Sequence, residues 1–174
     1  IDLPHISNFT DFDSLRIEPD VFLRIIRSIN DLNHPDVVIL PGSKNVIGDL
    51  EYLRQSGLDR KIVDLSEKGA TEVVGLCGGF QMLGQRVEDP YGIESATKTI
   101  HGLGLMPIST VMAQQKTLIR TEGTHLPSRL KVQGYEIHHG QLAATADGRA
   151  AVAGTDGRGI GLSGDGCRVW GTYL

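Results

Sequence analysis

The sequence of 174 residues is poor in the features that most readily assign a function. Its apolar runs, such as 37–40 (VVIL), are far too short to span a bilayer. Its formal net charge is −4 and it has no basic field or stripe, so neither nucleic acid nor a membrane surface is the expected partner. Its 40% hydrophobic and 22% charged residues are typical of one globular domain with a sizeable core.

Cysteines are also scarce. Cys77 and Cys167 are the two in the chain, and their different surroundings argue against a disulfide framework and predict a reducing, cytoplasmic compartment. Zinc-ligand spacing and a Walker-type lysine loop are both missing, so we expect neither a metal nor ATP on this chain by itself. The chain starts at Ile1 without a methionine or a secretory leader, which favours a fragment or processed product.

The first half of the sequence alternates apolar runs with helical patterns. Strands are predicted at 21–26, 36–40 and 73–76, the second of them buried on both faces; helices are predicted from Val46 to Gly57, from Leu58 to Gly69, and at 80–83. This order predicts a parallel sheet flanked by helices, with right-handed crossovers. Ligands of such sheets bind beyond the carboxyl ends of the strands, where 41–44 (PGSK) and 76–79 (LCGG) both fall.

The second half has a different pattern. Asp-Gly pairs at 147–148, 156–157 and 165–166 are strong hairpin-turn signals. The segments 134–140 (GYEIHHG) and 168–174 (RVWGTYL) look like strands, so we expect antiparallel or irregular structure that extends the same domain. A G-x-G-x-x-G pattern begins at Gly159, but no strand–turn–helix context surrounds it, so it is not interpreted as a dinucleotide site.

Residues 75–79 (GLCGG) match the pattern G-x-C-x-G directly after a predicted strand. A nucleophile on a sharp strand-to-helix turn needs small neighbours, and a helix amino terminus favours the thiolate. The N–H of Gly78 would point at an oxyanion that forms beside Cys77. The alternative is that Cys77 is a small buried hydrophobe, as Cys167 is interpreted to be.

Two further segments have open interpretations. Gly42 in the 41–44 loop either lets backbone N–H groups approach a substrate, as the second half of an oxyanion hole, or belongs to a plain turn with Ser43 or Asn45 capping the helix. On a strand at 134–140, Tyr135, Ile137 and His139 would share a face that looks like packing. Glu136 and His138 would share the other face, as a catalytic pair, a substrate clamp or a surface ion pair.

Four segments in this order resemble the glutamine amidotransferase domains of cobyric acid synthases, the CobB/CobQ type of class I. They are 3–15 (LPHISNFTDFDSL), 40–50 (LPGSKNVIGDL), 75–84 (GLCGGFQMLG) and 134–140 (GYEIHHG). Smaller matches lie at 89–94, 102–110 and 116–118, so the resemblance covers nearly the whole chain. It implies a flavodoxin-like α/β fold with a mostly parallel central sheet and an antiparallel carboxy-terminal extension.

The resemblance also implies a reaction. Cys77 would attack the side-chain amide of glutamine and release ammonia, with Gly42 and Gly78 forming the oxyanion hole. Ser43, Glu136 and His138 would line the glutamine site, and no metal or other cofactor is expected in this domain. An amino-terminal synthetase domain of the same polypeptide, absent here, would use ATP and Mg²⁺ to amidate carboxylates of a corrin ring in cobalamin synthesis.

Residues 1–174 are therefore interpreted as a single amidotransferase domain, truncated at both ends. The family pattern GTYLHG supplies a histidine base, and here the sequence stops at Leu174, just before it. His139 also departs from the family, which usually has methionine there. The rival interpretations are another elbow-cysteine hydrolase, such as a DJ-1/PfpI-like peptidase or deglycase, and a non-catalytic binding module.

Overall fold

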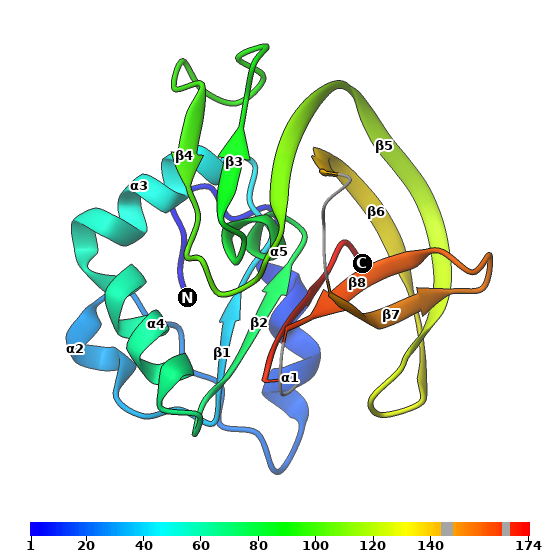
Figure 1. The fold of residues 1–174 in the computed structure, drawn as a ribbon. Coiled ribbons are helices and arrows are strands. Elements are labelled where there is room, and N and C mark those ends of the chain that lie inside the picture. The colour runs from blue at the N-terminus through cyan, green and yellow to red at the C-terminus, as the bar shows by residue number, and fades with distance from the viewer. Residues whose placement is uncertain (144–147, 165–167) are drawn as a thin grey trace.

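The structure is a computed structural model that describes residues 1–143, 148–164 and 168–174. Its helices and strands follow the chain order shown in Figure 1: η1 (Phe9–Phe12), α1 (Asp13–Ile17), α2 (Ile29–Leu32), β1 (Val37–Leu40), α3 (Val46–Ser56), α4 (Leu58–Glu67), β2 (Glu72–Leu76), α5 (Gly78–Met82), β3 (Arg86–Glu88), β4 (Thr99–His101), β5 (Ser109–His125), β6 (Leu130–Leu142), β7 (Arg149–Gly154), β8 (Gly159–Ser163) and β9 (Val169–Thr172).

All of these strands belong to one mixed sheet, ordered β1-β2-β9-β8-β7-β5-β3-β4, with β6 paired to β5. The strands that carry the site, β1, β2 and β9, are parallel to one another. The β5–β6 hairpin and the β7–β8 hairpin are antiparallel and form a separate lobe beside this parallel part (Figure 1). The predicted parallel centre and antiparallel extension are therefore both present.

The helices around the parallel strands begin and end where the sequence predicts. The Asn45 side chain caps α3 by accepting a hydrogen bond from Gly48 N at 2.8 Å. Gly57 ends α3 with a left-handed backbone, φ 73°, which glycine adopts without steric penalty. Gly69, also left-handed, follows the last turn of α4. These caps direct the chain back into β2 and toward the turn that follows it.

One predicted strand is wrong and another lies differently. Residues 21–26 form no strand, because no other described segment pairs along their length, although the Ile26 carbonyl accepts a hydrogen bond from Asp2 N at 2.8 Å. The strand at 37–40 exists, but it is not buried on both faces, because Val37 and Ile39 share a face that is only partly covered. Val37 is accordingly 45% exposed, while Leu40 is fully buried.

The antiparallel half confirms the predicted turn at 156–157, where Gly157 has φ 83° and joins β7 to β8. The predicted turns at 147–148 and 165–166 involve residues outside the described ones. Cys167 also lies outside the described residues. The strand at 169–172 differs in direction from what we expected, since it runs parallel to β2 and completes the central part of the sheet. Within the described residues, no helix is long and apolar enough to cross a membrane.

The main hydrophobic core lies around the parallel strands and contains Phe80, whose side chain is fully buried. A second, smaller cluster of Ala151, Val152 and Ile160 lies in the antiparallel lobe. The site described next is where the two parts of the molecule meet, at the carboxyl end of β2.

Candidate active site

Cys77 occupies a sharp turn between β2 and α5. Its backbone has φ 49° and ψ −105°, a positive φ that non-glycine residues rarely adopt. The turn is held by hydrogen bonds from Cys77 N to the Thr172 carbonyl at 2.7 Å and from Gln81 N to the Cys77 carbonyl at 3.2 Å. The surrounding structure thus holds a strained residue at the end of a central strand, as nucleophiles on such turns require.

The glycines around Cys77 are required by space. A Cβ on Gly75 would lie 2.6 Å from the backbone of Phe80, so β2 and α5 pack without room for a side chain. A Cβ on Gly79 would lie 2.6 Å from the carbonyl carbon of Leu40 and 2.8 Å from the Pro41 oxygen. The predicted need for small residues at both ends of the G-x-C-x-G pattern is therefore confirmed.

The 41–44 loop lies against the cysteine turn. A Cβ on Gly42 would be 3.8 Å from Cys77 Cβ, and one on Gly78 would be 2.8 Å from Ser43 N. The 41–44 loop and the cysteine turn therefore adjoin beyond the carboxyl ends of β1 and β2, with Gly42 beside Cys77 and Ser43 beside Gly78. The backbone alone makes this juxtaposition.

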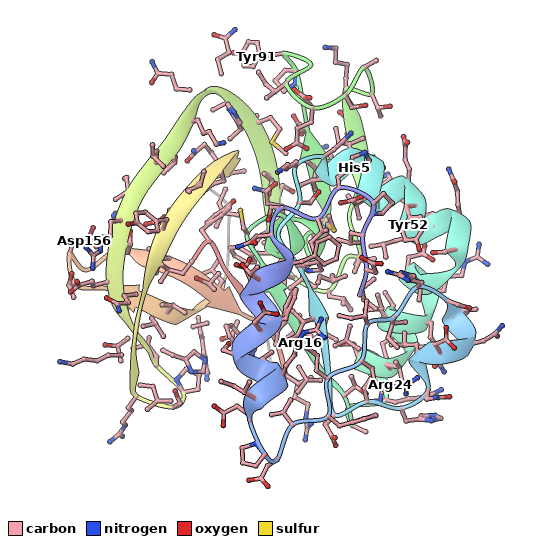
Figure 2. The ribbon with its side chains drawn as sticks, turned by 180° about the vertical axis from the view of Figure 1, so that it is seen from behind. His5, Arg16, Arg24, Tyr52, Tyr91 and Asp156 are labelled. Atoms are coloured by element: carbon pink, nitrogen blue, oxygen red, sulfur yellow. The ribbon has the colours of Figure 1, made fainter. Side chains whose placement is uncertain are left out.

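The Ser43 side chain has a local partner. Its hydroxyl donates to Asp49 Oδ2 at 2.6 Å and accepts from Asn45 N at 3.0 Å. Asp49 is fully buried and also accepts from the backbone and ring of His5, at 3.1 and 2.9 Å to Oδ1. His5 (Figure 2) belongs to the 3–15 segment, which the Asp49 carboxylate joins to the loop. The predicted contact of Ser43 with glutamine stays a prediction.

Cys77 is half-buried and its thiol hydrogen is directed at the Ile137 carbonyl of β6, with 3.7 Å between sulfur and oxygen. Burial raises the pKa of the Cys77 thiol to about 11, although the Gly78 N–H at the sulfur lowers it. The sequence favoured a thiolate on the basis of the helix amino terminus. That expectation is wrong, because desolvation by burial outweighs the hydrogen bond from the Gly78 N–H.

On β6 the structure reverses the predicted faces. Tyr135 and Ile137, expected to pack, are 61% and 44% exposed. Glu136 and His138 are 4% and 7% exposed, so they are not a surface ion pair. The reason is the curl of the β5–β6 hairpin, which turns the Glu136 face toward the β7–β8 hairpin and β9. His139 is intermediate in exposure, and its Nδ1 lies 3.0 Å from the Ala113 carbonyl oxygen.

Glu136 is held by hydrogen bonds inside the lobe. Its Oε1 accepts from Thr121 Oγ1 at 2.6 Å and from Arg158 Nη2 at 3.2 Å. Arg158 follows the β7–β8 turn, whose Asp156 is labelled in Figure 2, and it also donates to that carboxylate at 2.6 Å. His138 Nε2 is 3.8 Å from Glu136 Oε2, which is too long for a hydrogen bond. The pair thus shares a face without a direct bond.

A carboxylate that the sequence interpretation left without a role lies beside the site. Glu94 Oε2 accepts a hydrogen bond from Val46 N at 2.7 Å, at the first residue of α3. Burial raises the pKa of Glu94 to about 7, and its negative charge in turn raises the pKa of Cys77. Asp89 holds this loop by accepting from the backbone of Ile93 and Glu94, both at 2.8 Å. The 89–94 match was the sequence signal for this group.

Two cavities lie away from Cys77. One of about 270 Å³ is bounded by α3 and α4, and one of about 630 Å³ is bounded by the amino-terminal segment and β1. Among the described ranges, no three His, Cys, Asp or Glu side chains are grouped to hold a metal ion. The chemistry that this geometry supports is attack by the Cys77 thiol on a carbonyl, with the Gly78 N–H close to the sulfur.

Comparison with known families gives a match over the whole chain. The model of the CobB/CobQ-like glutamine amidotransferase domain matches residues 1–174. The chain is 48% identical over 174 residues to the adenosylcobalamin biosynthesis bifunctional protein CobDQ of Leptospira interrogans, covering all of this chain and 20% of that protein. It is 48% identical over 173 residues to the cobyric acid synthase of Geobacillus kaustophilus, covering 98% of this chain and 34% of that enzyme.

Solved structures with the same fold are more distant. A glutamine amidotransferase aligns with a TM-score of 0.66 at 14% identity, over 93% of this chain and 79% of the other. The PurLQS structure from Thermotoga maritima aligns with a TM-score of 0.67 at 16% identity, over 98% of this chain and 82% of the other. These likenesses confirm the expected fold. The chain spans only a fifth to about a third of the length of the curated relatives named above.

Proposed function

Because the chain belongs to the CobB/CobQ-like glutamine amidotransferase domain family, we propose that it hydrolyses glutamine through Cys77 and provides the ammonia for an amidation elsewhere in a larger protein. The observation that carries this proposal is the backbone at Cys77. Cys77 has a positive φ between a central strand and a helix, with crowded glycines on both sides. This backbone conformation is strained, and a cysteine with only a structural role would gain nothing from the strain.

The reaction would proceed in two steps. Cys77 Sγ attacks the side-chain amide carbon of glutamine, the carbon–nitrogen bond breaks, and the nitrogen leaves as ammonia after it takes up the thiol proton through a base. A glutamyl thioester remains. Water then attacks that carbon, the carbon–sulfur bond breaks, glutamate leaves and the thiol regains its proton.

The oxyanion of each step would be stabilised by backbone N–H groups at Gly42 and Gly78. Both glycines lie beside Cys77, and a Cβ on Gly78 would displace the Ser43 backbone. Fixed N–H donors in a partly buried site stabilise a developing negative charge strongly, and loss of one such donor typically reduces kcat by about 10²–10³. Ser43, Glu136 and His138 would position the substrate around this centre.

A base is required because the resting thiol has a pKa of about 11 and is protonated at neutral pH. His138 is a poor candidate, since the Cys77 thiol is directed at the Ile137 carbonyl and not at the His138 ring. The family pattern places the base directly after Leu174. Leu174 lies against β6, where a Cβ on Gly134 would be 2.8 Å from its Cδ2. A histidine at the next position would therefore start beside β6, the strand that carries Glu136 and His138.

The acceptor of the ammonia would be a carboxylate of a corrin ring, as the name of the cobyric acid synthase relatives suggests. The relatives are three to five times longer than the aligned segment, since it covers 20–36% of them. The remaining part would hold ATP, Mg²⁺ and the corrin substrate. This division requires no cofactor on the present chain.

The test is carried out in the full-length protein that contains this chain. Cys77→Ser should abolish glutamine-dependent amidation, with a loss of at least about 10³-fold, while amidation with free ammonium stays within about twofold of the parent. Loss of both activities in a folded variant would refute the division of labour.

A second experiment separates this proposal from its rivals. A glutamine-analogue electrophile should label Cys77, and glutamine should protect the thiol. A hydrolase of the DJ-1/PfpI kind would show no protection by glutamine, and a non-catalytic module would show neither labelling above that of a free thiol nor turnover.

A further inference from the structure

Asp49 is a fully buried acidic residue in the first turn of α3. Its carboxylate accepts three hydrogen bonds, from Ser43 Oγ at 2.6 Å and from the backbone and ring nitrogens of His5 at 3.1 and 2.9 Å. His5 lies beside α3 in Figure 2. A buried carboxylate is costly unless fixed donors surround it, so its presence indicates a use beyond the filling of space. The two residues that donate to it show where that use lies.

The 5–7 segment and the 41–44 loop are also joined through their backbones. Two hydrogen bonds of 2.8 Å run between them, and one of these is accepted by the Gly42 carbonyl. Between the two bonds, Ile6 and Ser43 face each other as an isolated antiparallel bridge. In such a non-hydrogen-bonded pair, the N–H and C=O groups of the two central residues point away from each other. The N–H of Ser43 therefore points away from the 5–7 segment.

The orientation of the Gly42–Ser43 peptide follows from the same bonds. Its carbonyl oxygen accepts from Ser7 N, and because a trans peptide is planar, its N–H points the opposite way. The cysteine turn lies at this nitrogen, since a Cβ on Gly78 would be 2.8 Å from Ser43 N. The N–H of Ser43 is thus the donor that the loop can present to a carbonyl at Cys77.

Gly42 makes this orientation easy to lose. Glycine has a permissive backbone, so rotation of the Gly42–Ser43 peptide meets little steric resistance. A rotated peptide would turn the Gly42 carbonyl oxygen toward the site, where it would repel a developing negative charge instead of stabilising it. The loop therefore needs a group outside it that fixes the peptide.

We propose that Asp49 is a positioning residue for glutamine hydrolysis. By tying Ser43 to His5, it holds the Ser43 N–H toward the carbonyl that Cys77 attacks. Ser43 then acts on the reacting carbonyl through its N–H, while its hydroxyl is occupied by Asp49 and by Asn45 N.

This inference rests on the proposed function and adds the group that aims one of its oxyanion donors. Such a donor acts on the transition state more than on bound glutamine, so the effect of Asp49 should fall on kcat. A residue that contacts the substrate in its ground state would change KM instead. Amidation with free ammonium bypasses Cys77 and should be unaffected.

Asp49→Asn and Ser43→Ala are the main variants, measured in the full-length protein that contains this chain. Asn keeps the shape of the carboxylate but accepts through one oxygen only, and Ala removes the hydroxyl that donates to Asp49. We expect kcat for glutamine hydrolysis to fall about 10- to 100-fold in each, because complete loss of one oxyanion donor costs about 10²–10³. KM should stay within about twofold, as should the Kd of glutamine in the Cys77→Ala background.

The double variant tests whether the two residues act through one another. Because both substitutions remove the same contact, Asp49→Asn combined with Ser43→Ala should be within about twofold of the slower single variant. Multiplied effects would contradict a shared role. The matched control is Asp64→Asn, which loses an exposed contact with Lys68 on α4 and should keep the kcat of the parent.

Failure of this inference is distinguishable from failure of the proposed function. If the parent does not hydrolyse glutamine, the proposed function fails. If the parent does, and both variants keep its kcat while remaining folded by circular dichroism, the positioning role of Asp49 is refuted. Should Asp49→Asn not fold, Ser43→Ala decides alone, since it removes the hydroxyl that ties the loop to Asp49.

Two other results would also overturn the positioning role. A rise in KM with kcat unchanged would mean that Asp49 and Ser43 bind the substrate instead of aiming a donor. Equal loss of amidation with free ammonium, in a variant that is folded, would mean that the 41–44 loop acts on the amidation and not on the hydrolysis of glutamine.

Discussion

The two walls of the site are constructed differently. The wall formed by the Cys77 turn and the 41–44 loop is made by backbones that approach so closely that Gly75, Gly78 and Gly79 have no space for a Cβ. The wall formed by β6 is made by side chains, with Glu136 bonded to Thr121 and to Arg158. The first wall depends on the absence of side chains at a few glycine positions, and the second depends on which side chains pair with one another.

This difference determines what each wall tolerates. Backbone crowding cannot be relieved by a rotamer change, so an added methyl group displaces main chain on both sides. A side-chain network can lose one member and relax, at the cost of the hydrogen bonds that the member made. Substitutions in the two walls should therefore differ in size and in kind.

The largest effect is expected for Gly79→Ala. The new Cβ would lie 2.6 Å from the Leu40 carbonyl carbon, where α5 packs on the end of β1, and should lower the free energy of unfolding by about 3 kcal/mol or more. Denaturant unfolding of the variant measures this. Gly159→Ala is the control, because no heavy atom lies within 4 Å of its added Cβ, and a change below about 0.5 kcal/mol is expected there. Equal effects at the two positions would contradict the steric account of this wall.

A smaller effect is expected for Thr121→Val in the β6 wall. The change keeps the shape but removes the 2.6 Å hydrogen bond to the buried carboxylate of Glu136, which should lower the free energy of unfolding by about 2 kcal/mol. Thr124→Val, on the same strand, is the control. In a double-mutant cycle, Glu136→Gln should remove most of the difference. Additivity of the two changes would show that the contact contributes nothing.

The first wall could be predicted from the sequence because residue type alone, at neighbouring positions, marks the turn. Gly75, Cys77 and Gly79 are adjacent, a buried strand precedes them, and the steric demand of the turn is carried by residue type alone. The same holds for α3, where Asn45 and Gly57 mark both ends. For such segments, pattern and structure agree closely.

The second wall could not be predicted to the same extent. The period of a strand separates Glu136 from Tyr135 but does not say which face is covered, and that depends on how the hairpin curls over the β7–β8 turn. Arg158, which pairs with Glu136, is 22 positions away. The strand prediction at 21–26 was wrong for a related reason. Its apolar pattern suits a strand, but a strand also requires a neighbouring strand to pair with, and the pattern does not show one.

The raised pKa of Glu94 could not be predicted from the sequence either, and the Glu94→Gln variant tests it. An unfolded glutamate titrates near 4.5 and folded Glu94 near 7, so between these values the folded state binds more protons than the unfolded state. The free energy of unfolding should therefore fall as pH rises from 4.5 to 7. Allowing for solvent screening, the Glu94 share of this fall is about 1 kcal/mol.

The Gln variant should flatten that fall, as measured by denaturant unfolding at pH 5 and pH 8. It should also lower the pKa of Cys77, seen as faster alkylation at a given pH, because a negative charge near the thiol is removed. Glu51→Gln, on the exposed side of α3, is the control. Identical pH profiles in both variants would separate Glu94 from the nucleophile.

The smallest effect is expected on the outer face of β6, for Tyr135→Ala. The alternation of 134–140 alone assigns Tyr135 to packing, in which case truncation would cost about 3–5 kcal/mol. The structure leaves Tyr135 61% exposed, so the expected change in the free energy of unfolding is below about 0.5 kcal/mol. Thermal unfolding of Tyr135→Ala beside His138→Ala decides between the two faces. A variant at Tyr135 that unfolds more readily than the one at His138 would mean that the hairpin curls the other way, and that the side-chain wall of the site is not the one that Glu136 and His138 form.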